Sequence, residues 1–197
     1  MEEIKKIIAE LSSGEDERSE AAVQAVASHG AAALQPLRDL LASNESSEAQ
    51  AVDVRWWAVR ALAEITDPEV TSLLIYHLGD QDAGIRQCAA LGLRKQPDPQ
   101  ALHTLVSALN DADPLVASLA GDALAAIGAP AVPALLEVLH DGPQNTRLEA
   151  VRALAKIGDH RSIPALFAAL QEDSQLMEYW ANEGLERMGV GMTFFKP

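Results

Sequence analysis

Apolar residues return along this chain at the spacing of an α-helix. In the stretch VRWWAVRALAEI, Val54, Ala58 and Leu62 fall on one face when each residue advances by about 100°. A breaker such as TDP or GAP follows, and a second apolar stretch around Leu74 comes after it. No segment keeps a sustained alternation of apolar and polar residues. The pattern therefore predicts helices and no sheet.

The pair of helices recurs along the chain. An alanine marks the same position of the first helix at intervals of 31, 31, 30 and 31 residues; these alanines are Ala58, Ala89, Ala120, Ala150 and Ala181. One such pair is too short to bury its apolar face alone, whereas stacked pairs bury it together. We therefore expect a single all-α domain, a right-handed α-solenoid of about five two-helix repeats. Its predicted parts are an N-terminal helix at 1–12, repeats at 15–42, 53–83, 84–114, 115–144 and 145–175, and a half-repeat with a tail at 176–197.

The stretches VRWWAVRALAEITDPEV and TRLEAVRALAKIGDHRSIPAL, with the acidic turns that close each copy, resemble HEAT repeats. The resemblance is to the short bacterial HEAT-like repeats of the phycobilisome-lyase type, a group that includes bilin lyase subunits, scaffolds and regulatory adaptors. It implies a non-catalytic module that binds a protein partner on its concave helix surface. The alternative that it implies is a bilin lyase or isomerase subunit acting with a second HEAT-like chain. It supplies no catalytic residue, metal ligand or cofactor to carry over, and we expect none.

The two functions differ in a simple observable. A bilin role predicts a visible-absorbing adduct when the chain is mixed with phycocyanobilin, whereas a scaffold leaves the spectrum unchanged.

Charge narrows the choice of partner. Acidic residues outnumber basic ones 29 to 15, which gives a net charge of −14. Such a chain repels nucleic-acid phosphates and anionic membrane surfaces, so we expect a neutral or basic protein partner, unless the charge serves solubility alone. The single cysteine and the absence of a signal-peptide pattern or a long apolar run predict a cytoplasmic protein.

The second helix of each repeat lines the concave side in solenoids that resemble this one. Its positions beside the apolar face form a mixed, mildly polar groove. The predicted partner-binding residues there are Ser72, Tyr76, His103, Ser107 and Glu137.

Two neighbouring tryptophans raise a question about the other surface. Trp57 falls on the flank of the apolar face, whereas Trp56 falls opposite it, in a column that Tyr179 shares. Either the loop of residues 42–52 or the N-terminal helix covers Trp56, or Trp56 anchors a partner.

The C-terminal tail raises the same question. Phe194 and Phe195 follow the last predicted helix and have no repeat behind them. They either fold back to cap the end of the stack or pack against a second copy of the chain.

A row of acidic turn residues follows the repeat: Asp80, Asp111, Asp141 and Glu172. Arginines stand at one helix position in three repeats (Arg55, Arg86 and Arg147), and Ala117 interrupts their row. The acids either bind a cation or a basic peptide, or pair as turn residues with arginines of neighbouring repeats.

Motifs for catalysis are absent from the sequence. The five histidines form no HExxH and none precedes a glutamate, so we expect surface or turn histidines. No phosphate loop or nucleophile elbow occurs. Cys88 is either a small buried hydrophobe or a thiol for bilin attachment or redox chemistry.

Overall fold

The computed structural model describes residues 2–190, and these are helical throughout apart from short turns. They form twelve α-helices and four short 3-10 helices, without a strand in the described range. The prediction of an all-α repeat fold of the solenoid type is confirmed. The chain divides into two compact units, residues 1–96 and 97–197. The expected single domain stays a prediction.

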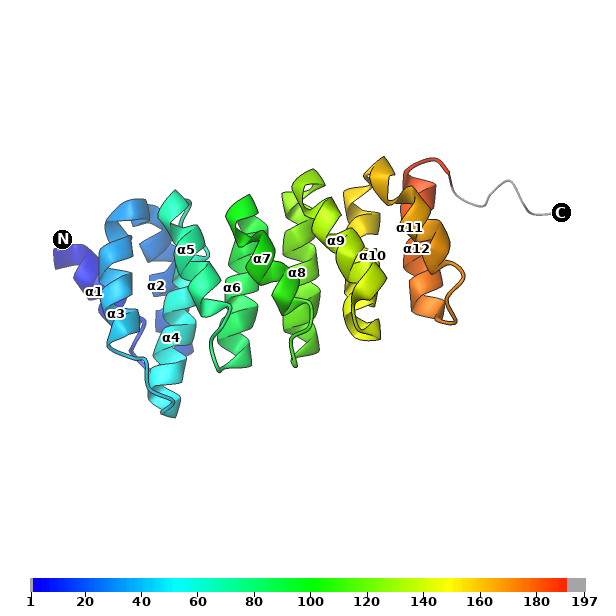
Figure 1. The fold of residues 1–197 in the computed structure, drawn as a ribbon. Coiled ribbons are helices and arrows are strands. Elements are labelled where there is room, and N and C mark those ends of the chain that lie inside the picture. Colours follow the sequence, from blue (N-terminus) through cyan, green and yellow to red (C-terminus); the bar gives the residue numbers. More distant parts are fainter. Residues whose placement is uncertain (1, 191–197) are drawn as a thin grey trace. The chain divides into compact units, whose positions relative to one another are not determined.

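The first unit is a stack of helix pairs (Figure 1). Its elements are α1 (Glu2–Glu10), α2 (Asp16–His29), the 3-10 helix η1 (Gly30–Ala33), α3 (Leu34–Ala42), α4 (Ala49–Leu62), α5 (Pro68–His77) and α6 (Ala83–Lys95). The first helices of the repeats, α2, α4 and α6, pack side by side. The second helices lie on one side of this row, with α3 against α4 and α5 against α6.

Helix α4 begins earlier than the repeat pattern predicts. It starts at Ala49, whereas the predicted repeat starts at residue 53, so the preceding loop spans only residues 43–48. The reason is that Ala51 continues the apolar face upstream and is buried. The extended backbone of Glu48 then ends the loop directly before the helix.

The second unit repeats the same design (Figure 1). Its elements are η2 (Pro99–Ala101), α7 (Leu102–Ala108), α8 (Pro114–Ile127), η3 (Ala129–Ala131), α9 (Val132–Asp141), α10 (Gln144–Ile157), η4 (His160–Ser162), α11 (Ile163–Ala169) and α12 (Gln175–Arg187). Here α8, α10 and α12 form the row of first helices, and α7, α9 and α11 pack against them.

Small residues and leucines make the core of both units. The five marker alanines are fully buried, and so are the leucines at the matching position of the second helices: Leu74, Leu105, Leu135 and Leu166. The alanines let neighbouring first helices approach closely, while the leucines fill the space between first and second helices.

Asp-Pro pairs begin α5 and the 3-10 helix η2. Asp67 accepts a hydrogen bond from the backbone N–H of Glu69, with Pro68 as the first residue of α5. Asp98 does the same for Gln100. An aspartate at this position supplies an acceptor for a backbone N–H that the helix leaves unpaired, and proline removes another such donor.

No single helix in residues 2–190 has both the length and the apolar character needed to cross a membrane. One bent pair, Pro114–Ile127 with Ala129–Asp141, passes on length and composition alone, with an angle of 116° between its helices.

Candidate functional site

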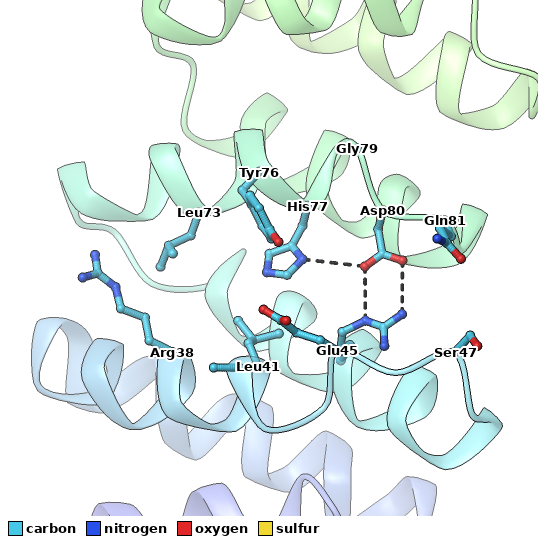
Figure 2. Close-up of a pocket in the computed structure, with 12 residues that line it drawn as sticks. Arg38, Leu41, Glu45, Ser47, Leu73, Tyr76, His77, Gly79, Asp80 and Gln81 are labelled. Carbon is cyan, nitrogen blue, oxygen red and sulfur yellow. Dashed lines mark hydrogen bonds and ion pairs between the residues drawn. The ribbon is translucent and has the colours of Figure 1, made fainter.

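A pocket of about 450 Å³ opens in the first unit, between the second helices α3 and α5 and beside the loop of residues 43–48 (Figure 2). This volume is within the range of about 300–1,000 Å³ that is typical of small-molecule sites. The lining residues are Arg38, Leu41, Ala42, Glu45, Ser47, Arg55, Leu73, Tyr76, His77, Gly79, Asp80 and Gln81.

One side of the pocket is apolar. Leu41 of α3 and Leu73 of α5 face each other across it (Figure 2), and Tyr76 stands at the same wall with 69% of its surface exposed. The Tyr76 ring meets the His77 ring edge to face, with 5.1 Å between the centroids. A large ring left in water beside an apolar wall is a surface that a ligand would cover favourably.

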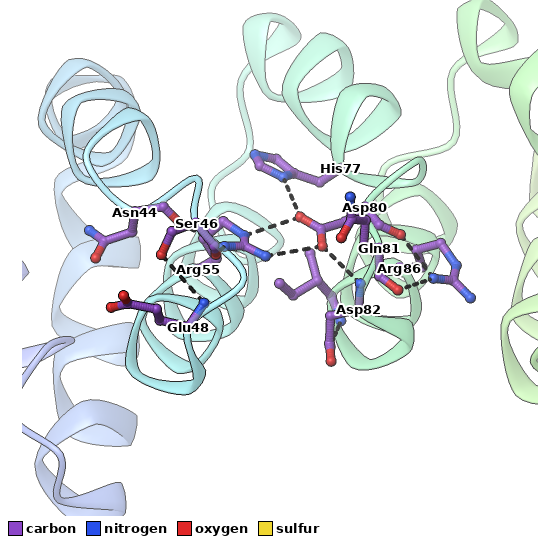
Figure 3. A network of polar contacts seen from close by, with 10 residues as sticks. Asn44, Ser46, Glu48, Arg55, His77, Asp80, Gln81, Asp82 and Arg86 are labelled. Carbon is purple, nitrogen blue, oxygen red and sulfur yellow. Dashed lines mark hydrogen bonds and ion pairs between the residues drawn. The ribbon is translucent and has the colours of Figure 1, made fainter.

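The other side is held by a buried ion pair. Arg55 of α4 donates from Nε and Nη2 to the two carboxylate oxygens of Asp80, at 3.2 and 3.3 Å. Its Nη1 donates to the backbone oxygens of Asn44 and Ser46, at 2.7 and 2.5 Å (Figure 3). Only 7% of the Arg55 side chain and 11% of the Asp80 side chain are exposed. Arg55 therefore ties the 43–48 loop to the turn after α5, and both border the pocket.

Hydrogen bonds set the charge of Asp80. Burial alone would raise the pKa of its carboxyl group. The backbone N–H of Asp82 and the guanidinium of Arg55 donate to the carboxylate and together hold its pKa below the ordinary value. Asp80 is therefore ionised at neutral pH.

His77 is a buried polar residue in the lining of the pocket. Only 5% of its surface is exposed, and its Nδ1 lies 3.9 Å from Oδ2 of Asp80, too far for a hydrogen bond. Burial lowers the pKa of the imidazole, and the positive charge of Arg55 adds to this, although Asp80 opposes it. The imidazole is therefore neutral at neutral pH, and its Nδ1 lacks a partner.

The predicted groove residues are exposed, as expected for a surface. Tyr76 lines the pocket, whereas Ser72, on the same helix, is outside its lining. The other three belong to the second unit and are exposed there: His103, Ser107 and Glu137. Their role in binding a partner stays a prediction.

Which of the two explanations offered for Trp56 holds stays a prediction, but the structure shows one of its contacts. The ring is half-buried and lies against Gly84 at the start of α6: a Cβ on Gly84 would come within 3.2 Å of Trp56 Cδ1. Trp57 is buried and meets Trp56 edge to face at 4.8 Å. The angular argument considered one helix alone and therefore missed that α6 leaves room for this ring by having no side chain at residue 84.

The other aromatic residue that the sequence places opposite the apolar face is in the last described helix, α12. Tyr179 is 57% exposed and meets Trp180 edge to face at 5.1 Å. Phe194 and Phe195 lie outside the described residues, so the two roles proposed for the tail stay predictions.

The acidic row forms ion pairs with arginines at two places, but each pair lies within one repeat and not, as expected, between neighbouring repeats. Arg55 pairs with Asp80, and Arg147 pairs with Glu172, each with the acid 25 residues after the arginine. Where Ala117 interrupts the arginine row, Asp141 pairs instead with the neighbouring His140 at 2.6 Å. Within residues 2–190 no group of three or more His, Cys, Asp or Glu side chains is placed to hold a metal ion.

Cys88 is half-buried in α6. Burial raises the pKa of its thiol to about 11, against a smaller opposite effect of Arg60. The thiol is therefore protonated at neutral pH, which disfavours it as a nucleophile and favours the small-hydrophobe interpretation.

Sequence reasoning missed most of the pocket. The expectation of surface or turn histidines is wrong for His77, which is buried. A signal for it exists: three residues after the buried leucine of each second helix, the other repeats carry Leu40, Ala108, Val138 and Ala169. A histidine at a position that otherwise holds apolar residues indicates a buried polar group.

Comparisons with known proteins give two curated relatives from cyanobacteria. The chain is 38% identical over 92 residues to the phycobilisome maturation protein of Synechococcus elongatus, covering 47% of this chain and 44% of that protein. It is 40% identical over 74 residues to the bilin biosynthesis protein RpcF of Synechococcus sp. WH8020, covering 38% and 35%. The chain thus spans less than half the length of these relatives.

Solved structures support the fold. The complex of CpcE and CpcF of the phycocyanin lyase from Nostoc matches with a TM-score of 0.59 and 22% identity, over 76% of this chain and 96% of that chain. A designed armadillo repeat protein in complex with the peptide (KR)4 matches with a TM-score of 0.52 and 18% identity, over 94% and 99%. At these identities the likeness concerns the fold alone.

The named relatives overturn the expectation that the chain is mainly a non-catalytic scaffold. Proteins of phycobilisome maturation and bilin biosynthesis favour the alternative, a role with bilin lyases. The family model for HEAT repeats matches residues 47–112 and 102–186. These matches together cover more than half of the chain, which therefore belongs to the HEAT-repeat family.

Proposed function

We propose that this chain is a subunit of a bilin lyase or isomerase that acts together with a second HEAT-like chain. The observation that carries the proposal is the similarity to a phycobilisome maturation protein and to a bilin biosynthesis protein, at 38% and 40% identity. The likeness of fold to a phycocyanin lyase complex of two chains is consistent with it.

The geometry of the first unit supports a role with a small ligand. The pocket of about 450 Å³ combines an apolar wall and an exposed aromatic ring with polar groups at defined places. This combination is what sites for organic cofactors usually offer.

The chain contributes to bilin attachment without a covalent bond of its own. The Cys88 thiol has a pKa of about 11 and is half-buried, so it is a poor nucleophile at neutral pH. The thiol that receives the bilin then belongs to another protein, the acceptor.

The protein partner belongs to the same proposal. The net charge of −14 favours a neutral or basic second chain. The proposed contacts of the second chain are the exposed groove residues Ser72, Tyr76, His103, Ser107 and Glu137. The secondary candidates are Trp56, Tyr179, Phe194 and Phe195. A cytoplasmic location also stays a prediction.

Reconstitution tests the proposal. The purified chain is mixed with a second HEAT-like chain from the same host, phycocyanobilin and a phycobiliprotein subunit that lacks its chromophore. Covalently attached bilin on the acceptor is then read from visible absorbance after denaturation. We expect attachment when both HEAT-like chains are present, and a Cys88→Ser variant that is as active as the wild type.

The controls omit one component at a time. Attachment that proceeds equally without this chain contradicts the proposal. A reaction that needs this chain but fails for Cys88→Ser would instead restore the thiol as a participant.

A further inference from the structure

The pocket in the first unit leaves two buried polar atoms without a partner. In residues 2–190 four buried side-chain nitrogen or oxygen atoms have no hydrogen bond: Arg38 Nε, His77 Nδ1, Glu149 Oε2 and Arg152 Nε. The last two belong to residues that pair with each other, at 3.0 Å between Arg152 Nη2 and Glu149 Oε2. The first two both line the pocket. This pocket is therefore lined by two residues that each leave a buried side-chain nitrogen without a hydrogen-bond partner.

The two unpaired atoms lie at different parts of the pocket. Arg38 is on α3, at the end where Leu41 and Leu73 form the apolar wall (Figure 2). One guanidinium nitrogen, Nη2, donates to Glu69 at 2.8 Å, and Nε is unpaired. His77 is on α5, between Tyr76 and the Asp80 carboxylate. A ligand that contacts both must be long enough to cross the apolar wall.

The charges of the pocket define where an anionic group can sit. Asp80 and Glu45 lie at the His77 side and repel an anion there, and the charge of Arg55 is already matched by Asp80. Arg38 lies at the opposite side, and its partner Glu69 is well exposed, with 65% of the side chain accessible. A carboxylate can compete with an exposed partner for an arginine, because an exposed ion pair is weak.

We propose that this pocket is the bilin-binding site of the chain, with a bilin carboxylate on Arg38, a bilin ring against Tyr76 and a ring N–H or carbonyl group on His77. The inference rests on the proposed function for the identity of the ligand, while the pocket and its unpaired atoms are independent of it. A bilin is an open chain of linked rings with carboxylate side chains, so it supplies an extended conjugated body together with both kinds of polar group.

Arg55 and Asp80 act in this site as positioning residues. They satisfy each other and hold the 43–48 loop beside the turn after α5, which keeps the His77 side of the pocket in shape. They need no contact with the ligand.

Titration of the purified chain with phycocyanobilin tests the site, with binding read from the change in visible absorbance. We expect Tyr76→Ala and Arg38→Gln each to weaken binding by about tenfold or more, through loss of stacking and of a charge-assisted hydrogen bond. Both residues are at least one-third exposed at their side chains, so both variants should fold. Circular dichroism checks this.

Two matched controls come from the same chain. Tyr179→Ala removes an equally exposed tyrosine of the second unit and should leave the affinity unchanged. Glu69→Gln removes the competitor of the ligand for Arg38 and should leave the affinity unchanged or raise it. Unchanged affinity in both pocket variants, an equal loss in Tyr179→Ala, or no binding by the wild type would overturn the inference.

The same wild-type and variant proteins are also assayed in the reconstituted attachment reaction. This assay distinguishes a failure of the proposed site from a failure of the proposed function. If the wild type supports attachment and the pocket variants bind bilin normally, the site is elsewhere and the function stands. If the pocket variants lose bilin binding but the wild-type chain never supports attachment, the site stands and the function is wrong.

Discussion

Arg55 connects the repeat pattern to the pocket. It stands at the helix position that carries an arginine in three repeats, and like Arg147 it pairs with an acid 25 residues later. What distinguishes Arg55 is its deeper burial, and it also donates to two backbone oxygens of the preceding loop, whereas Arg147 donates to one backbone oxygen, that of Leu139. The same ion pair that closes a turn elsewhere therefore builds a wall of the pocket here.

This difference predicts unequal effects of one substitution. Arg55→Met leaves the buried Asp80 carboxylate without its ionic partner and two loop oxygens without their donor, and should lower the free energy of unfolding by about 3–5 kcal/mol. Arg147→Met disrupts a pair whose side chains are both 27% exposed and should cost about 1 kcal/mol. Urea denaturation measures both variants. Equal losses of unfolding free energy in the two variants would show that burial does not determine how much the Arg55–Asp80 pair stabilises the protein.

Cys88 gives a prediction for chemical reactivity. Because burial raises its pKa to about 11, the thiolate fraction is small at pH 8 and grows as the pH approaches 11. We expect slow reaction with iodoacetamide in the native protein at pH 8 and a much faster reaction in urea at the same pH. Mass spectrometry follows the alkylation. Equal alkylation rates in the native and the unfolded protein would contradict the conclusion that burial protects the Cys88 thiol.

At the residue scale the sequence predicted what repeats and missed what occurs once. Aspartate caps, marker alanines and the arginine–acid spacing are visible because several repeats share them. The burial of His77 and the place of Trp56 against Gly84 depend on one particular contact between helices, and a pattern on a single helix does not contain it.

At the element scale, close approach of neighbouring helices depends on one row of small residues. Gly92 of α6 and Gly184 of α12 occupy the same repeat position, which holds Ala61, Ala123 and Ala153 in the other copies. A Cβ on Gly92 would lie 2.8 Å from a Leu74 methyl and 2.9 Å from the Ala63 Cβ, and one on Gly184 would meet the Ala155 backbone at 2.9 Å. These positions therefore need glycine for space, although their backbone is ordinary helix.

This packing predicts opposite effects for two glycines. Gly92→Ala should lower the free energy of unfolding by about 1–2 kcal/mol, because overpacking outweighs the better helix propensity of alanine. In Gly121→Ala the new Cβ meets its neighbours at no less than 3.4 Å, so the propensity gain of up to about 1 kcal/mol should remain.

Thermal unfolding of the two variants distinguishes them. A stabilised Gly92→Ala protein would show that α6 can move away from α4 and α5 at little cost. A strongly destabilised Gly121→Ala protein would show that the space beside the Arg152 guanidinium is needed.

Element boundaries followed from the sequence where breakers are strong. Helix α8, which follows Asp113 and starts at Pro114, begins one residue before the predicted start of its repeat, whereas α4 begins four residues before the predicted start of its repeat. The polar stretch SNESSEAQ contains no proline or glycine, so nothing in it marks where the loop ends and the helix begins.

At the scale of the whole molecule, repeat architecture was predictable and the main function was not. Stacked helical pairs follow from a period of about 31 residues. The same architecture serves scaffolds and enzyme subunits alike, and the preference for a scaffold was wrong because the named relatives, which favour the alternative, are not visible in the repeat pattern.

The acidity of the chain leads to a prediction for assembly. If the second HEAT-like chain is basic, a chain with a net charge of −14 should bind it less tightly as salt rises, because screening weakens long-range attraction. Calorimetric titration at two salt concentrations measures this. Affinity that is independent of salt would indicate a neutral partner surface.

The central claim is that this HEAT-repeat chain handles a bilin. The visible absorbance spectrum of phycocyanobilin, recorded before and after addition of the purified chain, tests it most directly. We expect an altered spectrum, with the bilin absorbance co-eluting with the chain in size-exclusion chromatography and the effect reduced in Tyr76→Ala. An unchanged spectrum and separate elution, with the chain alone and together with its second HEAT-like chain, would contradict it.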